Sequence, residues 1–139
     1  MPASWYREQM SFALRRASEE QAKQRDVLCH QAWGSRLTID QFCAREDLLR
    51  HTAWSTSAMR TWVLSHCQQG TVASCETFRM QAQLLHAGQK KEGHIEAVAS
   101  VFVEPALRGN HYASVMLERV VDVARTEGAL AVILFSEVG

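Results

Sequence analysis

Apolar and polar positions repeat with different periods along the chain, and each period predicts a different kind of element. Residues 11–15, 61–65 and 71–80 alternate with a period close to two, so they are predicted to be strands. A short turn separates the last two segments, which suits an antiparallel hairpin. We therefore expect a sheet whose second and third strands are neighbours.

The second half of the chain contains the other predicted strands. Residues 83–93 are polar and contain glycine and lysine, which predicts a mobile loop. Residues 94–104 follow as a strand, and Pro105 ends it because proline has no N–H to donate to a sheet. Residues 129–135 are continuously apolar, which is typical of a strand buried on both faces.

Three helices are predicted between these strands. Capping-box patterns at Ser18 and Thr38 indicate that helices begin there. They are expected to end near Trp33 and Arg50. A third helix is predicted from about Asn110, since apolar residues recur there at spacings of three and four.

The order is thus strand, two helices, three antiparallel strands, helix and strand, and the last three elements need a parallel crossover. This order predicts a mixed sheet covered by helices, an α/β (α+β mixed) fold. The 139 residues suffice for one hydrophobic core. We assign residues 1–10 to an N-terminal extension and residues 11–139 to the domain.

The composition excludes several classes of protein. Lys plus Arg and Asp plus Glu each number 15, so no net charge favours a nucleic-acid or membrane-surface binder. No apolar stretch approaches the ~20 residues that span a bilayer, and the N-terminus does not have the pattern of a secretory signal. We therefore expect a cytoplasmic protein with no membrane and no nucleic-acid partner.

The cysteines do not form a recognisable site. Cys29, Cys43, Cys67 and Cys75 include no CxxC pair and no zinc-site spacing. A chain of this length does not need a disulfide framework. We predict four free, mostly buried thiols and no metal.

The segment of residues 101–114 carries the clearest chemistry. A strand ends at a proline, Arg108 and Gly109 follow, and a helix begins with the small Ala113 in its first turn. The first N–H groups of a helix have no intrahelical acceptor, and the helix dipole adds positive charge there. Together with the Arg108 guanidinium, these groups predict an anion site suited to a pyrophosphate.

This segment resembles motif A of the GNAT acetyltransferases, Arg/Gln-x-x-Gly-x-Gly/Ala. Arg108 matches its first position and Ala113 its last, while His111 stands where the family has glycine. Three segments together resemble the fungal lysine N-acetyltransferases of lysine catabolism: ASCET from Ala73, SVF with RG and HYA between residues 100 and 113, and LFSEVG from Leu134.

The resemblance implies a GNAT-like acyl-CoA N-acyltransferase fold and acetyl-CoA as co-substrate. It also implies that the domain is C-terminally truncated, without the last helix and strands and the tyrosine proposed there as the acid. The implied function is acetyl transfer to a primary amine, plausibly the side-chain amine of free lysine. The implied cofactor-binding residues are Val101, Val103, Arg108, Gly109, Asn110, His111, Tyr112 and Ala113. The Cβ of His111 is expected to weaken this binding without abolishing it.

Acetyl transfer to an amine also needs a proton acceptor and a donor to the oxyanion. The backbone N–H of Val103 is the expected oxyanion donor. Glu104, at the end of its strand, and Glu76, on the neighbouring strand, are the candidate catalytic bases, although carboxylates at such positions are more often solvated strand residues. His94 is a further candidate, because histidine is a common proton acceptor near neutral pH.

Two other functions stay open. The chain would be a non-catalytic acetyl-CoA-binding module if the missing acid is essential. It would be a protein-interaction module if the fold binds no cofactor and the last strand pairs with another chain, either a second copy or a different protein. The expected partners are thus a small-molecule amine and a possible homo-oligomer.

Overall fold

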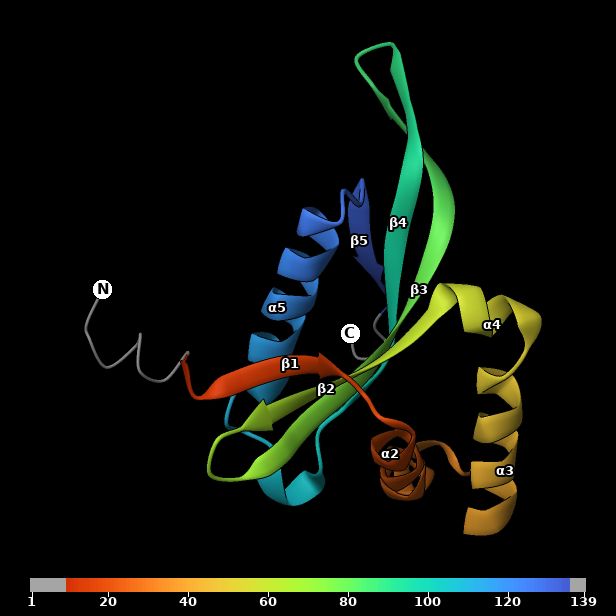
Figure 1. Ribbon diagram of the computed structural model, residues 1–139, viewed down its shortest axis with the longest axis vertical. Coiled ribbons are helices and arrows are strands. Elements are labelled where there is room, and N and C mark those ends of the chain that lie inside the picture. The colour runs from red at the N-terminus through yellow and green to blue at the C-terminus, as the bar shows by residue number, and fades with distance from the viewer. Residues whose placement is uncertain (1–9, 136–139) are drawn as a thin grey trace.

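The computed structural model describes residues 10–135, in which a twisted five-stranded sheet separates one long helix from three others (Figure 1). Neighbouring strands follow the chain in the order β1-β2-β3-β4-β5. The first four pair antiparallel, and β5 runs parallel to β4. The strands are β1 (Phe12–Arg16), β2 (Met59–His66), β3 (Gly70–His86), β4 (Gln89–Phe102) and β5 (Ala131–Leu134). The predicted mixed sheet with a final parallel strand is therefore confirmed.

The helices cover the two faces of the sheet unequally. In Figure 1, α5 lies on one side of the sheet and α2, α3 and α4 lie on the other. Their bounds are α2 (Glu19–Trp33), α3 (Ile39–Arg50), α4 (Ala53–Ala58) and α5 (Tyr112–Thr126), and a 3-10 turn, η1 (Pro105–Leu107), precedes α5. Both predicted capping boxes form, at Ser18 and at Thr38. The helix α4 was not predicted from the sequence.

The hydrophobic core is divided between the two faces. The larger cluster lies between the sheet and α5, where Leu64 and Met116 are fully buried. A smaller cluster joins Cys29 of α2 and Phe42 of α3 to Phe102 at the end of β4. The end of β4 is thus fixed by α2 and α3, and this end positions the site described below.

The predicted loop at residues 83–93 is wrong, because β3 and β4 continue as an antiparallel ribbon beyond the rest of the sheet (Figure 1). Gln83 pairs with Glu92, and its amide donates to the Glu92 carboxylate at 3.2 Å. The turn consists of Ala87 and Gly88, both with positive φ, at 49° and 74°. Such turns match the twist of the flanking strands. The two strands can therefore pair here even though their side chains are polar and both faces of the ribbon are in water.

The last strand and the end of β4 also differ from the predictions. Within the described residues β5 pairs only with β4, and its side chains are partly exposed rather than buried on both faces. Residues 136–139, which carry the end of the LFSEVG segment, lie outside the described residues, as do residues 1–9. Strand β4 ends at Phe102 instead of residue 104. No helix among residues 10–135 has the length and apolar character needed to span a membrane.

The four cysteines differ in burial, and this predicts how they react. All four are free; Cys29 and Cys75 are buried, Cys43 is half-buried and Cys67 is exposed. Burial raises the pKa of Cys29 and of Cys75 to about 12. Since the thiolate is the reactive species, we expect an aromatic disulfide reagent to modify Cys67 first, and Cys29 and Cys75 only after unfolding.

The reaction is followed by absorbance, with peptide mass spectrometry to identify the labelled thiols. A Cys67→Ser variant should lack the fast phase and keep the others. Labelling of Cys29 or Cys75 in the fast phase of the native chain would contradict the burial of these two side chains.

Candidate functional site

Strand β4 contains a bulge that reverses the facing of its side chains. Val98, Val101 and Val103 all pack toward the cluster under α5, which regular alternation along a strand does not allow. The register with β3 shifts at this point, and Ser100 has a positive φ of 51°. One extra residue is therefore inserted into β4, as in bulges that end strand pairing or redirect side chains.

A groove opens where β4 and β5 stop pairing. Among the described residues their pairing ends at Val98 and Leu134. A groove of about 760 Å³ lies beyond this point, between α2, α3, the bulge of β4 and the end of β5. Most of its lining is apolar, including Cys29, Trp33, Phe42, Val101, Leu117 and Leu134. Within residues 10–135, the backbone edge of β4 beyond Val98 thus has no pairing with β5 and lies next to a cavity.

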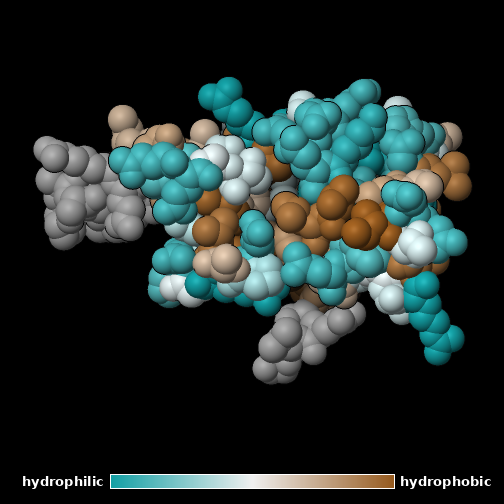
Figure 2. Space-filling model, turned by 90° about the horizontal axis from the view of Figure 1, so that it is seen from below, coloured by the Kyte–Doolittle hydropathy of each residue, from teal (hydrophilic) through white to brown (hydrophobic). Residues whose placement is uncertain are grey.

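The groove also contains exposed apolar surface and three charged side chains. Hydrophobic side chains gather in a band across the face shown in Figure 2, between hydrophilic margins. Arg25, Arg45 and Glu46 are the charged residues of the groove lining. Arg45 Nη2 lies 2.8 Å from Glu46 Oε1, and its guanidinium covers the ring of Phe42 at 4.8 Å. Glu46 is therefore the carboxylate that the fold places in the groove.

The loop after β4 brings a cation to the start of α5. Gly109 has a φ of 85°, and His111 is the N-cap with a φ of 60° and no side-chain cap bond. The first N–H groups of α5 therefore have no intrahelical acceptor. Arg108 Nε donates to the Val103 carbonyl at 3.0 Å, and its Nη groups have no hydrogen-bond partner among residues 10–135. Free amides and free guanidinium N–H groups thus lie on the same short loop.

The other loop residues of the prediction have different roles. Asn110 Nδ2 donates to the Leu107 carbonyl at 3.0 Å, which closes the turn. Tyr112 is buried, and its hydroxyl donates to Gln69 Oε1 at 2.7 Å. Ala113 is half-buried in the first turn of α5. Tyr112 can therefore offer a ligand only its backbone N–H.

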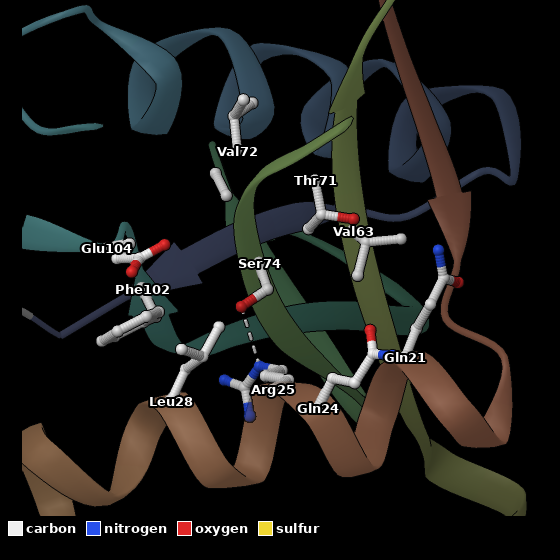
Figure 3. A pocket seen from close by; sticks show the side chains of 11 residues that line it. Gln21, Gln24, Arg25, Leu28, Val63, Thr71, Val72, Ser74, Phe102 and Glu104 are labelled. Atoms are coloured by element: carbon white, nitrogen blue, oxygen red, sulfur yellow. Dashed lines mark hydrogen bonds between the residues drawn. The ribbon is translucent and has the colours of Figure 1, made fainter. Parts of the chain in front are cut away.

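The two candidate bases lie in different surroundings, and neither belongs to the groove lining. Glu76 is 5% exposed, with Oε1 at 3.3 Å from Arg25 Nη1. Burial raises the pKa of Glu76, and the charge of Arg25 opposes that shift. Glu104 is exposed and lines a cavity of about 70 Å³ between α2 and β3 (Figure 3). His94 lies beyond the opposite end of the segment of β4 that pairs with β5.

Arg25 is the site residue that sequence reasoning missed. It is 5% exposed, and Nε donates to Ser74 Oγ at 2.9 Å, as Figure 3 shows. Nη2 donates to the Ser100 carbonyl at 2.7 Å. An arginine in a polar helix reads as a solvated side chain, so nothing in the local sequence marks it.

Comparisons with known proteins concern the family and the fold of this chain. The sequence matches the acetyltransferase (GNAT) family over residues 26–139. A relative from Yarrowia lipolytica, named lysine acetyltransferase, is 35% identical over 97 residues, which are 65% of this chain and 24% of that protein. The chain thus spans less than two thirds of the length of this relative.

Solved structures show the same fold. A GNAT family acetyltransferase from Staphylococcus aureus has a TM-score of 0.66 at 12% identity, covering 91% of this chain and 87% of that chain. Glucosamine-6-phosphate N-acetyltransferase from Arabidopsis thaliana has a TM-score of 0.61 at 19% identity, with coverage of 91% and 83%. An acetyltransferase from Clostridium acetobutylicum, solved with acetyl-CoA, has a TM-score of 0.64 at 16% identity, with coverage of 90% and 80%. The GNAT-like fold expected from the sequence is confirmed.

Proposed function

Since the chain belongs to the acetyltransferase (GNAT) family, we propose that it transfers acetyl from acetyl-CoA to a primary amine, and that the amine is the side-chain amine of free lysine. The observation that carries the proposal is the bulge of β4, which lies beside a groove of about 760 Å³, just beyond the last β4–β5 pair among residues 10–135, and leads into the Arg108 loop. The name of the Yarrowia lipolytica relative supports lysine as the acceptor.

The proposed cofactor site has two parts. The pyrophosphate of acetyl-CoA binds at the start of α5, to the amides of residues 109–113 and to Arg108. The pantetheine arm follows the open edge of β4 and hydrogen-bonds to the backbone of Val101 and Val103. Two observations on residues 10–135 support this assignment: the Nη groups of Arg108 have no hydrogen-bond partner there, and the edge of β4 beyond Val98 has no pairing with β5.

The proposed chemistry needs a neutral amine, an oxyanion donor and a leaving thiolate. The amine nitrogen attacks the thioester carbonyl, and the Val103 N–H donates to the oxygen that becomes negative. The nitrogen gives up a proton as the carbon–sulfur bond breaks, and coenzyme A leaves as the thiolate. Glu76 and Glu104 stay the proposed proton acceptors. The raised pKa of Glu76 suits a base, but Glu76 is buried against Arg25 and neither carboxylate belongs to the groove lining.

The proposed setting is lysine catabolism in the cytoplasm. The four cysteines are free, which suits a reducing compartment. Pairing of the β5 edge with a second chain stays a prediction. These assignments depend on the proposed activity and are wrong if that activity is absent.

Calorimetry with acetyl-CoA and a thiol-release assay with lysine test the proposal together. Heat of binding and release of coenzyme A in the presence of lysine are the expected results. Absence of binding heat at millimolar acetyl-CoA would overturn the proposal and favour the alternative, a protein-interaction module that binds no cofactor. Binding without release, for lysine and for a panel of other amines, would establish the non-catalytic alternative.

Replacing His111 by glycine tests the departure from the family motif. A non-glycine residue in the left-handed region costs about 1–2 kcal/mol, and the extra freedom of glycine in the unfolded chain offsets about 0.5–1 kcal/mol. We therefore expect His111→Gly to be slightly more stable to urea and to bind acetyl-CoA more tightly, because no side chain crowds the phosphates.

Ser35→Gly is the matched control, since Ser35 also has a positive φ, of 47°, in the turn between α2 and α3. It should change the free energy of unfolding by a similar amount and leave acetyl-CoA binding unaltered. Weaker binding by His111→Gly would show instead that the imidazole contacts the cofactor.

A further inference from the structure

Arg25 connects three elements through one guanidinium group. From α2 it donates to Ser74 Oγ and approaches the Glu76 carboxylate on β3, and it donates to the Ser100 carbonyl on β4. Glu76 is as buried as Arg25, so the pair is shielded from water. Each of the three guanidinium nitrogens thus has its own acceptor.

Of the three acceptors of Arg25, the Ser100 carbonyl matters most for β4, because it is part of the backbone of that strand. A carbonyl in a regular strand bonds to a neighbouring strand, whereas this one bonds to a helix side chain at 2.7 Å. Ser100 also has a positive φ, a strained backbone state that persists only when surrounding contacts hold it. Arg25 supplies such a contact from outside the sheet.

The bulge determines which way the following amides point. Without the extra residue, Val101 and Val103 would exchange faces with Phe102, and the backbone groups of this segment would turn over. The groove lining includes Arg25, Ser100 and Val101, so the contact lies at the groove itself. Holding Ser100 therefore fixes the edge of β4 that faces the groove.

We propose that Arg25 is a positioning residue: by holding the Ser100 carbonyl, it orients the backbone of Val101, and of Val103 just after β4, for the acetyl thioester. This inference rests on the proposed acetyl transfer. Arg25 acts through its contacts with the Ser100 carbonyl at the bulge and with the Glu76 carboxylate, and does not itself contact the acetyl thioester. The planar guanidinium group of Arg25 presents its N–H groups to three separate acceptors. A lysine ammonium cannot reach all three in the same geometry.

The test compares Arg25→Lys with Arg50→Lys. Arg50 is a matched control because its Nη2 donates to both oxygens of the buried Asp26, at 2.8 and 2.9 Å, without contacting β4. Both substitutions keep a positive charge beside a buried carboxylate. The readouts are kcat and KM for acetyl-CoA and lysine, the urea midpoint, and amide hydrogen exchange of the peptide with residues 99–103.

Arg25→Lys is expected to lower kcat about 10- to 100-fold, since small displacements of positioning groups have effects of that size. It should also accelerate exchange of the 99–103 amides and leave the KM for lysine unchanged. Arg50→Lys should lower the urea midpoint to a similar degree and alter neither kcat nor that exchange.

Wild-type kcat and exchange in Arg25→Lys would overturn the inference, and so would equal losses in both variants. If the unsubstituted chain binds no acetyl-CoA, the proposed function fails on its own. The exchange measurement then still decides whether Arg25 holds the bulge.

Discussion

Replacing Arg108 by alanine and Gly109 by proline in one chain should weaken acetyl-CoA binding about a hundredfold or more, because two independent contributions are lost. A hydrogen bond from a charged group contributes about 1.5–3 kcal/mol, and each 1.4 kcal/mol is tenfold in affinity. Gly109 has a φ of 85°, which proline cannot adopt, so the loop and its amides must move. Proline also removes the Gly109 N–H from the anion site.

Titration calorimetry of the folded variant with acetyl-CoA measures this loss. The matched control is an Arg125→Ala, Gly88→Pro chain, which makes the same two changes at the far end of α5 and at the hairpin tip. Gly88 also has a positive φ, of 74°, with no atoms within 4 Å of a Cβ built there. The control should share the cost in stability and keep wild-type affinity. If the Arg108→Ala, Gly109→Pro variant still binds acetyl-CoA with wild-type affinity, the motif A segment is not part of the binding site.

The sequence identified the loop of the site because its signals are local. Arg108, Gly109 and the following helix are adjacent in the chain, and their chemistry follows from helix termini and backbone freedom. The bulge at Ser100 is different, since it depends on a contact with Arg25, 75 residues away in the sequence. Glu46 likewise enters the groove only because α3 packs beside α2. Partners distant in sequence leave no periodic signal.

The fold shows the same division between local and distant causes. Ser18 and Thr38 cap their helices as predicted, because a capping box involves only four consecutive residues. The loop predicted at residues 83–93 was wrong, because cross-strand pairing there outweighs a polar composition with low strand propensity. The apolar run that contains β5 predicted a strand correctly, but burial depends on what covers the strand, and run length does not report that.

Replacing Glu96 by alanine should lower the free energy of unfolding by about 3–5 kcal/mol, the usual effect of removing one partner from a buried ion pair. Glu96 is fully buried on β4, and its Oε1 accepts from Arg60 on β2 and Arg79 on β3, both at 2.8 Å. Without this carboxylate, the two guanidinium groups that share its oxygen are left with the partly exposed Glu127 as their common partner. Urea unfolding followed by circular dichroism measures the effect.

Glu127→Gln is the matched control, because Glu127 pairs with the same Arg60 and Arg79 and its side chain is 36% exposed. Exposed ion pairs contribute about 0–1 kcal/mol, so this variant should be nearly as stable as the wild type. Hydrogen bonding to Arg60 lowers the pKa of Glu127, so its small contribution is present above the unfolded pKa and disappears as the pH falls through the folded value. Comparing Glu127→Gln with the wild type at neutral pH and at low pH therefore isolates the contribution of the exposed pair. Equal losses in the two variants would show that Arg60 and Arg79, rather than the buried Glu96, determine the stability of this part of the sheet.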